Sequence, residues 1–92
     1  MIPLPYSIEK APGFEKALRK LASLNPEFGK AFENKLIQVL EEPHRFKPLG
    51  NQLHGFRRVH LMRSFVLIYE IIEAEKSVRL IRIEHHDKAY KI

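Results

Sequence analysis

The 92-residue sequence contains no cysteine, which excludes a disulfide framework and any zinc site built from cysteine ligands. It also has no long hydrophobic run, because the longest uninterrupted apolar stretch, residues 65–69, is far shorter than a membrane span. The first residues lack the basic and apolar segments of a secretory signal. We therefore expect a cytoplasmic protein with no membrane partner.

Several motifs of common enzyme classes are missing as well. No glycine-rich loop precedes a predicted helix, which argues against a nucleotide-binding turn. No paired carboxylates lie on predicted strands, which argues against a glycosidase. His85, His86 and Asp87 are adjacent, and neighbouring strand residues point to opposite faces, so they are poorly placed to chelate one ion. We expect neither a cofactor nor a metal.

The composition fits one small globular domain spanning residues 1–92, since 45% of the residues are hydrophobic and 29% are charged. The formal net charge of +5 is concentrated in residues 43–69, which contain no acidic residue and three of the five histidines. The basic residues of this segment are Arg45, Lys47, Arg57, Arg58 and Arg63. Such a segment indicates either a polyanion partner or a solvated loop.

Periodicity predicts the elements of the first half. Apolar residues alternate over residues 2–8, which predicts a strand, and its two prolines place that strand at a sheet edge. Residues 12–24 carry apolar residues at spacings of three and four, which predicts a helix. Asn25 and Pro26 suit the N-cap and first position of a second helix, which Pro43 ends.

After a predicted loop at 43–55, three strands are expected at 56–62, 65–72 and 78–84. The middle one is almost wholly apolar, as is typical of a central strand buried on both faces. In the last, we place Ile81 and Ile83 on one face and Leu80, Arg82 and Glu84 on the other. The predicted fold class is α+β: a two-helix hairpin packed on one face of a small antiparallel sheet, in the order strand–helix–helix–strand–strand–strand.

The sheet face away from the helices is predicted to carry Arg58, His60, Arg82 and His86. RNA cleavage needs a base for the 2′-hydroxyl proton, an acid for the leaving 5′-oxygen and a cation for the phosphorane. Histidine and arginine supply these groups, and an aromatic ring stacks on a base. Each residue also has a structural alternative: His60 as a hydrogen-bonded strand residue, Arg82 as the ion-pair partner of Glu70 or Glu84, and Tyr90 as a seal on the core.

Three stretches of the sequence form a recognisable pattern: Asn51-Gln52-Leu53-His54-Gly55-Phe56-Arg57-Arg58-Val59-His60, the apolar strand from Phe65 to Ile71, and the ending from Val78 to Tyr90. Together they resemble the RelE/ParE toxin superfamily, and within it the YafQ-type branch. The resemblance covers residues 49–90 well and the helices loosely. It implies a RelE-like fold and a toxin of a type II toxin–antitoxin pair, similar to small endoribonucleases that enter the ribosomal A site and cut mRNA.

The resemblance also implies roles for individual residues. His60 and His86 match the two histidines that move protons, Tyr90 matches the terminal aromatic that orients the substrate, and Arg57 and Arg82 match basic positions beside them. The RNA-binding residues are then expected to be Arg57, Arg58, Arg63, Lys47 and His54. Two positions depart from the branch: Ser64 stands where it has an acid, and Asn51 where it has a histidine, with His54 close by as a substitute.

The partners implied are a RelB- or DinJ-like antitoxin, the ribosome and mRNA. Two other functions stay open at this point. Relatives on the same fold inhibit DNA gyrase, which needs no catalytic histidine. The loss of the acid at Ser64 also leaves room for a non-enzymatic module that only binds its antitoxin or RNA.

Overall fold

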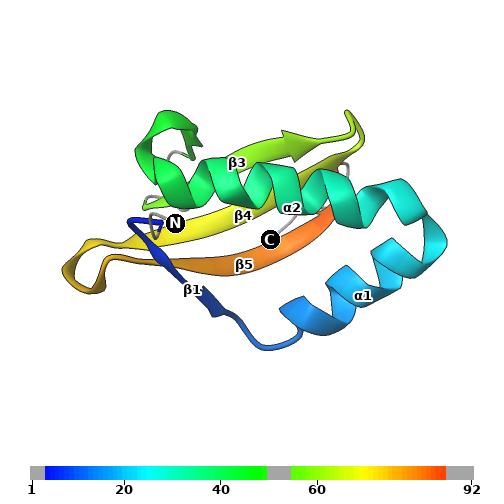
Figure 1. The fold of residues 1–92 in the computed structure, drawn as a ribbon, viewed down its shortest axis with the longest axis horizontal. Coiled ribbons are helices and arrows are strands. Elements are labelled where there is room, and N and C mark those ends of the chain that lie inside the picture. Colours follow the sequence, from blue (N-terminus) through cyan, green and yellow to red (C-terminus); the bar gives the residue numbers. More distant parts are fainter. Residues whose placement is uncertain (1–3, 50–54, 87–92) are drawn as a thin grey trace.

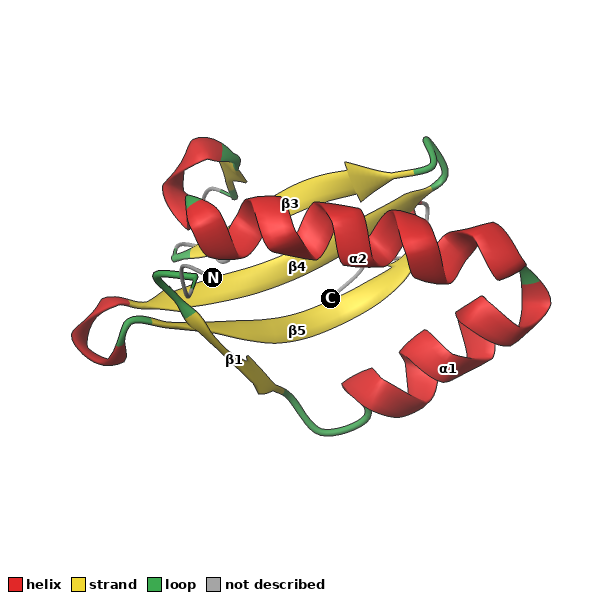
Figure 2. Ribbon diagram, in the orientation of Figure 1, coloured by secondary structure: helices red, strands yellow, loops and turns green. Residues whose placement is uncertain are grey.

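The computed structural model describes residues 4–49 and 55–86 and has two helices packed against one face of a five-stranded sheet (Figures 1 and 2). The sheet order is β1-β5-β4-β3-β2. None of the helices in the described ranges is long and apolar enough to span a membrane. The elements are β1 (Ser7–Lys10), α1 (Phe14–Leu24), α2 (Pro26–Glu41), the 3-10 turn η1 (Pro43–Arg45), β2 (Lys47–Pro48), β3 (Phe56–Leu61), β4 (Phe65–Ile72), the 3-10 turn η3 (Glu73–Glu75) and β5 (Ser77–His85).

The two helices meet where the sequence predicts. Asn25 ends α1, and its side chain accepts a hydrogen bond from the Glu27 amide at 3.0 Å, with Pro26 at the first position of α2. This cap satisfies a helix-terminal N–H that would otherwise lack a partner. The predicted start at residue 12 is two residues early, because Gly13 has a left-handed backbone (φ 84°) and α1 begins only after it. The chain reverses direction between the helices (Figure 1).

The sheet is mixed, whereas the sequence predicted an antiparallel one. β3, β4 and β5 form the expected antiparallel meander, but β1 pairs with β5 in parallel. The helix hairpin explains this difference, because it returns the chain to the end of the sheet where β1 begins. Tyr6 and His44, on either side of the hairpin, both hydrogen-bond to Glu73. The chain therefore enters β3 at the end of the sheet where it entered β1, so β3 runs parallel to β1. After the two antiparallel pairings of the meander, β5 runs in that direction as well.

Two further details differ from the prediction. The expected loop at 43–55 contains η1 and the two-residue strand β2, which pairs with β3 at the sheet edge, where Pro48 is tolerated. The described part of the N-terminal segment is extended as a strand only over β1, so the predicted strand at 2–8 is displaced toward residue 10. β1 is nevertheless an edge strand, as the two prolines of the predicted strand indicated.

A β-bulge in β5 overturns the predicted assignment of its faces. Tyr69 pairs with Leu80 and Ile68 with Arg82, so Ile81 is an extra residue in the ladder. Leu80 consequently lies with Ile83 in the core beneath the helices, and Ile81 packs on the opposite face. Arg82 stays on that opposite face, where the sequence placed it.

The core lies between the helices and the sheet. β4 is buried on both faces, as predicted: Leu67 and Tyr69 belong to the main core, and Val66 and Ile68 to a small cluster on the other face. The main core draws on every large element: Phe14, Phe28, Phe32, Val39, Leu40, Val59, Leu61, Leu67, Tyr69, Val78, Leu80 and Ile83.

Candidate functional site

The candidate site lies on the sheet face away from the helices. Strand register sets two rows of residues across this face: His60–Val66–Glu84, and next to it Arg58–Ile68–Arg82. Val66 and Ile68 are buried in the middle strand, with polar side chains on the strands at either side. Neighbouring strands lie about 4.8 Å apart, so residues in one row on β3 and β5 are separated by roughly 10 Å, with β4 between them. We call this surface the trough.

His60 and His86 meet at one end of the trough. Their rings are stacked, with centroids 5.5 Å apart and planes inclined by 26°. Partial burial lowers the pKa of His60 below its usual value, and the nearby charges of Arg58 and His86 lower it further. The structure thus places the two histidines that the sequence singled out in direct contact and favours the neutral form of His60.

A tight turn between β3 and β4 positions His86. Met62 and Arg63 both have left-handed backbones, with φ of 49° and 66°, a conformation unfavourable for residues with a Cβ atom. The turn presents the Ser64 carbonyl, which accepts a hydrogen bond from the His86 amide at 2.7 Å. The backbone of Ser64 therefore fixes the position of His86. The side chain of Ser64 stands where the YafQ-type branch has an acid.

Arg82 forms an ion pair with Glu84, at 3.2 Å between Nε and Oε1. This resolves the choice between Glu70 and Glu84, since Glu70 pairs with Arg79 at 3.7 Å between its Oε1 and Nη1. Glu84 was not predicted as a site residue. Its signal in the sequence was the alternation Arg82-x-Glu84-x-His86 at the end of β5, which puts polar groups on one face of a strand.

Comparisons with known proteins identify the family. The family described as "ParE toxin of type II toxin-antitoxin system, parDE" matches residues 8–90. The chain belongs to the ParE toxin family.

Relatives of this ParE-family toxin support the assignment. A protein named "Putative toxin RelE4" from Methanocaldococcus jannaschii is 37% identical over 86 residues, which cover 94% of this chain and 92% of the relative. A chain of the RelBE2 toxin–antitoxin complex of Mycobacterium tuberculosis superimposes with a TM-score of 0.74 at 23% identity, covering 92% of this chain and 95% of that one. YafQ from Escherichia coli gives a TM-score of 0.69 at 22% identity, covering 94% and 99%. The resemblance to the RelE/ParE superfamily and the RelE-like α+β fold are confirmed.

The other residues predicted to bind RNA or orient the substrate do not all lie in the trough. Arg57 lies on the helix-covered side of β3, where its Nη1 donates to the carbonyls of His44 at 3.1 Å and Phe46 at 2.7 Å, so the structure does not bring it to the trough. Lys47 lies on the edge strand β2, opposite Arg58. Arg63 is exposed in the β3–β4 turn. His54 and Tyr90 lie outside the described residues.

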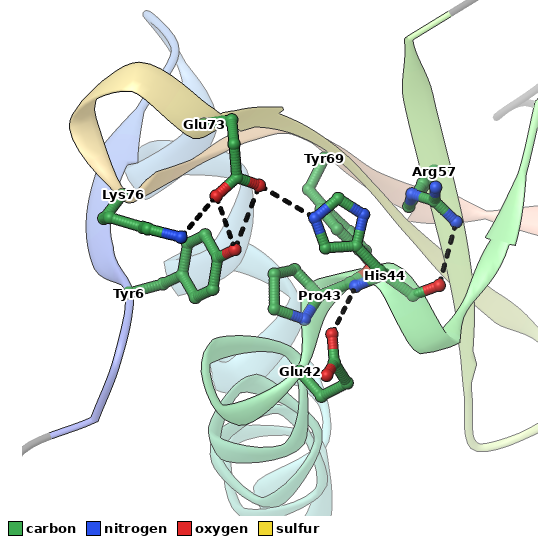
Figure 3. A network of polar contacts seen from close by, with 8 residues as sticks. All are labelled: Tyr6, Glu42, Pro43, His44, Arg57, Tyr69, Glu73 and Lys76. Carbon is green, nitrogen blue, oxygen red and sulfur yellow. Dashed lines mark hydrogen bonds and ion pairs between the residues drawn. The ribbon is translucent and has the colours of Figure 1, made fainter.

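A second polar cluster, which was not predicted from the sequence, lies at the other end of the fold (Figure 3). The Glu73 carboxylate accepts hydrogen bonds from Tyr6 at 2.9 Å and Lys76 at 2.6 Å, and it contacts His44 Nε2 at 2.8 Å. Hydrogen bonds from Lys76, His44 and Tyr6 lower the pKa of Glu73 to about 2. The cluster ties the start of β1, η1 and the β4–β5 turn together. Across residues 4–49 and 55–86, no group of three or more His, Asp or Glu side chains could hold a metal ion.

Proposed function

We propose that this toxin is a ribosome-dependent mRNA endoribonuclease that inhibits translation. The observation that supports the proposal is the stacked pair of His60 and His86, whose ring centroids are 5.5 Å apart, at one end of a trough that also carries Arg58 and Arg82. Two histidines in contact provide a proton acceptor and a proton donor for one phosphodiester. Two arginines across the same surface provide cations for its phosphate.

The reaction begins when a base removes the proton from a ribose 2′-hydroxyl. The 2′-oxygen attacks the adjacent phosphorus, and an acid protonates the departing 5′-oxygen, which leaves a 2′,3′-cyclic phosphate and a free 5′-hydroxyl. Because the two rings are in contact, one can serve as the base while the other serves as the acid; we propose His60 as the base, since its lowered pKa favours the neutral form, and His86 as its partner. The roles reverse in the hydrolysis of the cyclic product.

Charge on the phosphorane is stabilised by cations that stand opposite each other across the trough. Arg58 and Arg82 lie in one row, separated by Ile68. A guanidinium donates two parallel hydrogen bonds to a phosphate, which favours arginine over lysine in this role. Tyr90 is proposed to place the nucleotide, with Lys47, Arg63 and His54 contributing to RNA binding.

The proposed partners follow from the family and from the charge. A cognate antitoxin, as in the RelBE2 complex of M. tuberculosis, would bind the toxin and compete with RNA for the basic surface. Acidic antitoxin segments would be favoured by the net charge of +5. The ribosome and mRNA are polyanions, for which phosphate contacts dominate the affinity.

Cleavage of a reporter mRNA on purified ribosomes tests the proposal. We expect His60→Ala and His86→Ala each to slow cleavage by about 10²- to 10⁴-fold, the range of a lost general acid or base. His44→Ala is the matched control, because His44 is a half-exposed histidine that contacts Glu73 at the other end of the fold. Circular dichroism spectra verify that all three variants fold. Cleavage by both site variants at the wild-type rate would contradict the proposal.

Membership of the ParE family favours one other candidate, inhibition of DNA gyrase. That activity needs no proton transfer, so growth inhibition would persist in the double variant His60→Ala/His86→Ala, and the purified toxin would inhibit gyrase supercoiling. A chain that neither cleaves mRNA nor inhibits growth, yet binds an antitoxin tightly, would instead be a binding module.

A further inference from the structure

We infer that Glu84 is a positioning residue of the trough, which holds the guanidinium of Arg82 in place for the phosphate and weakens ground-state binding of RNA by its charge. The inference rests on the proposed ribonuclease function and extends it to a residue outside the family pattern quoted above. It follows from the contact between Glu84 and Arg82, from their place in the strand register and from the sign of the charges around them.

The contact fixes the direction of the arginine. Oε1 of Glu84 lies 3.2 Å from Nε of Arg82, the guanidinium nitrogen nearest the side-chain stem. Because the guanidinium is a rigid plane, an acceptor at Nε sets the orientation of the whole group. Both side chains are about one-third exposed, which limits their motion and still leaves the pair accessible from solvent. Glu84 therefore orients a cation that the proposed mechanism needs.

The register shows that Glu84 occupies the site itself. Glu84 pairs with Val66, and Val66 pairs with His60, so the carboxylate and the His60 ring lie in one row across β4. Glu84 is the acidic residue in the two rows that carry His60 and the two arginines. Two other acids on this face, Glu70 and Glu9, lie one row further along, and both pair with Arg79.

The charge of Glu84 opposes the binding of a phosphate. An anion placed in the trough would lie within about 10 Å of the carboxylate, since that is the width of two strand spacings. At that distance in water, one unit of like charge weakens binding by about two- to threefold. Glu84 thus has two separable effects: its acceptor oxygen orients Arg82, and its negative charge reduces the affinity for RNA before the reaction.

Two substitutions separate these effects. Glu84→Gln keeps an acceptor oxygen for Arg82 Nε and removes the charge, whereas Glu84→Ala removes both. We expect both variants to lower KM for ribosome-bound mRNA by about two- to threefold. Glu84→Gln should keep kcat within about threefold of wild type, and Glu84→Ala should lose about tenfold or more, since small misplacements of a catalytic group are costly. Glu75→Gln, an exposed residue of η3, makes the same change in net charge far from the site.

RNA affinity, measured by fluorescence anisotropy with a short labelled RNA, provides a second readout that does not need cleavage. We expect both Glu84 variants to bind this RNA more tightly than Glu75→Gln does. If the wild-type toxin cleaves mRNA and the Glu84 variants match Glu75→Gln in kcat, KM and RNA affinity, the role of Glu84 is wrong and the ribonuclease assignment stands. If the wild-type toxin leaves ribosome-bound mRNA intact, both are overturned.

Discussion

Arg57 offers a sharp test of how the basic residues of this toxin divide between scaffold and site. It is adjacent to Arg58, yet the alternation of β3 sends the two side chains to opposite faces. Arg57 holds the carbonyls of His44 and Phe46, so it anchors the segment that follows α2. We predict that Arg57→Ala lowers stability without removing a group from the trough.

The magnitude follows from the two hydrogen bonds. A hydrogen bond from a charged donor contributes about 1.5–3 kcal/mol, and neighbouring bonds from one side chain are not additive. The bond to Phe46 is short and partly buried, and the bond to His44 is longer and exposed. We therefore expect Arg57→Ala to lower the free energy of unfolding by about 2–3 kcal/mol. For a domain of this size, that loss lowers Tm by about 10–20 °C.

Urea denaturation and thermal melts of the purified chain measure this loss, and mRNA cleavage well below the melting temperature measures the chemistry. Arg58→Ala is the matched control, because it removes a guanidinium from the trough and leaves the bonds to His44 and Phe46 in place, so it should slow cleavage. Arg57→Lys should be intermediate in stability, because an ammonium cannot reach both carbonyls in the same fixed geometry. An Arg57→Ala variant that melts with the wild type and fails to cleave mRNA would refute the reasoning.

Two further predictions concern the scaffold. Tyr69→Phe should lower the free energy of unfolding in urea by about 1–3 kcal/mol, because the buried Tyr69 hydroxyl donates to the Pro43 carbonyl at 2.6 Å and its loss leaves that acceptor unsatisfied; unchanged stability would exclude a role for this bond. The pKa of Glu73 is held at about 2, below its ordinary value, so its contribution to stability is present above the ordinary pKa and is lost as the pH falls toward 2. Glu73→Gln should therefore have a lower Tm than wild type at pH 7, and the difference should shrink between pH 5 and pH 2; a constant difference would contradict the assignment.

Features set by local chemistry were predictable from the sequence. The junction at Asn25-Pro26 was placed correctly because a cap and a proline act within one turn of the chain. β4 was placed correctly because a strand buried on both faces needs an apolar run. His60 was assigned to the right face because alternation within β3 is uninterrupted.

Features set by pairing between distant segments were not predictable. The bulge at Ile81 depends on how β5 meets β4 at Ile68 and Tyr69, and a single inserted residue moves Leu80 and Ile81 to faces opposite to those expected. The parallel pairing of β1 depends on where the helix hairpin returns the chain. Glu84 was missed because an acid two residues from an arginine is indistinguishable in sequence from an ordinary surface ion pair.

The division of the basic residues changes how the net charge bears on function. The acid-free segment 43–69 indicated a polyanion partner, but its charges are spread over both sides of the sheet, with Arg57 on the helix side and Arg58 in the trough. The second arginine of the trough, Arg82, comes from the part of the sequence in which charges balance, and it is accompanied by Glu84. Under the proposed ribonuclease function, basic residues outside the trough should affect how tightly RNA is held and how strongly salt weakens binding. The rate of cleavage should depend instead on the few groups that the meander of β3, β4 and β5 brings together, so we expect affinity and catalysis to respond to different substitutions.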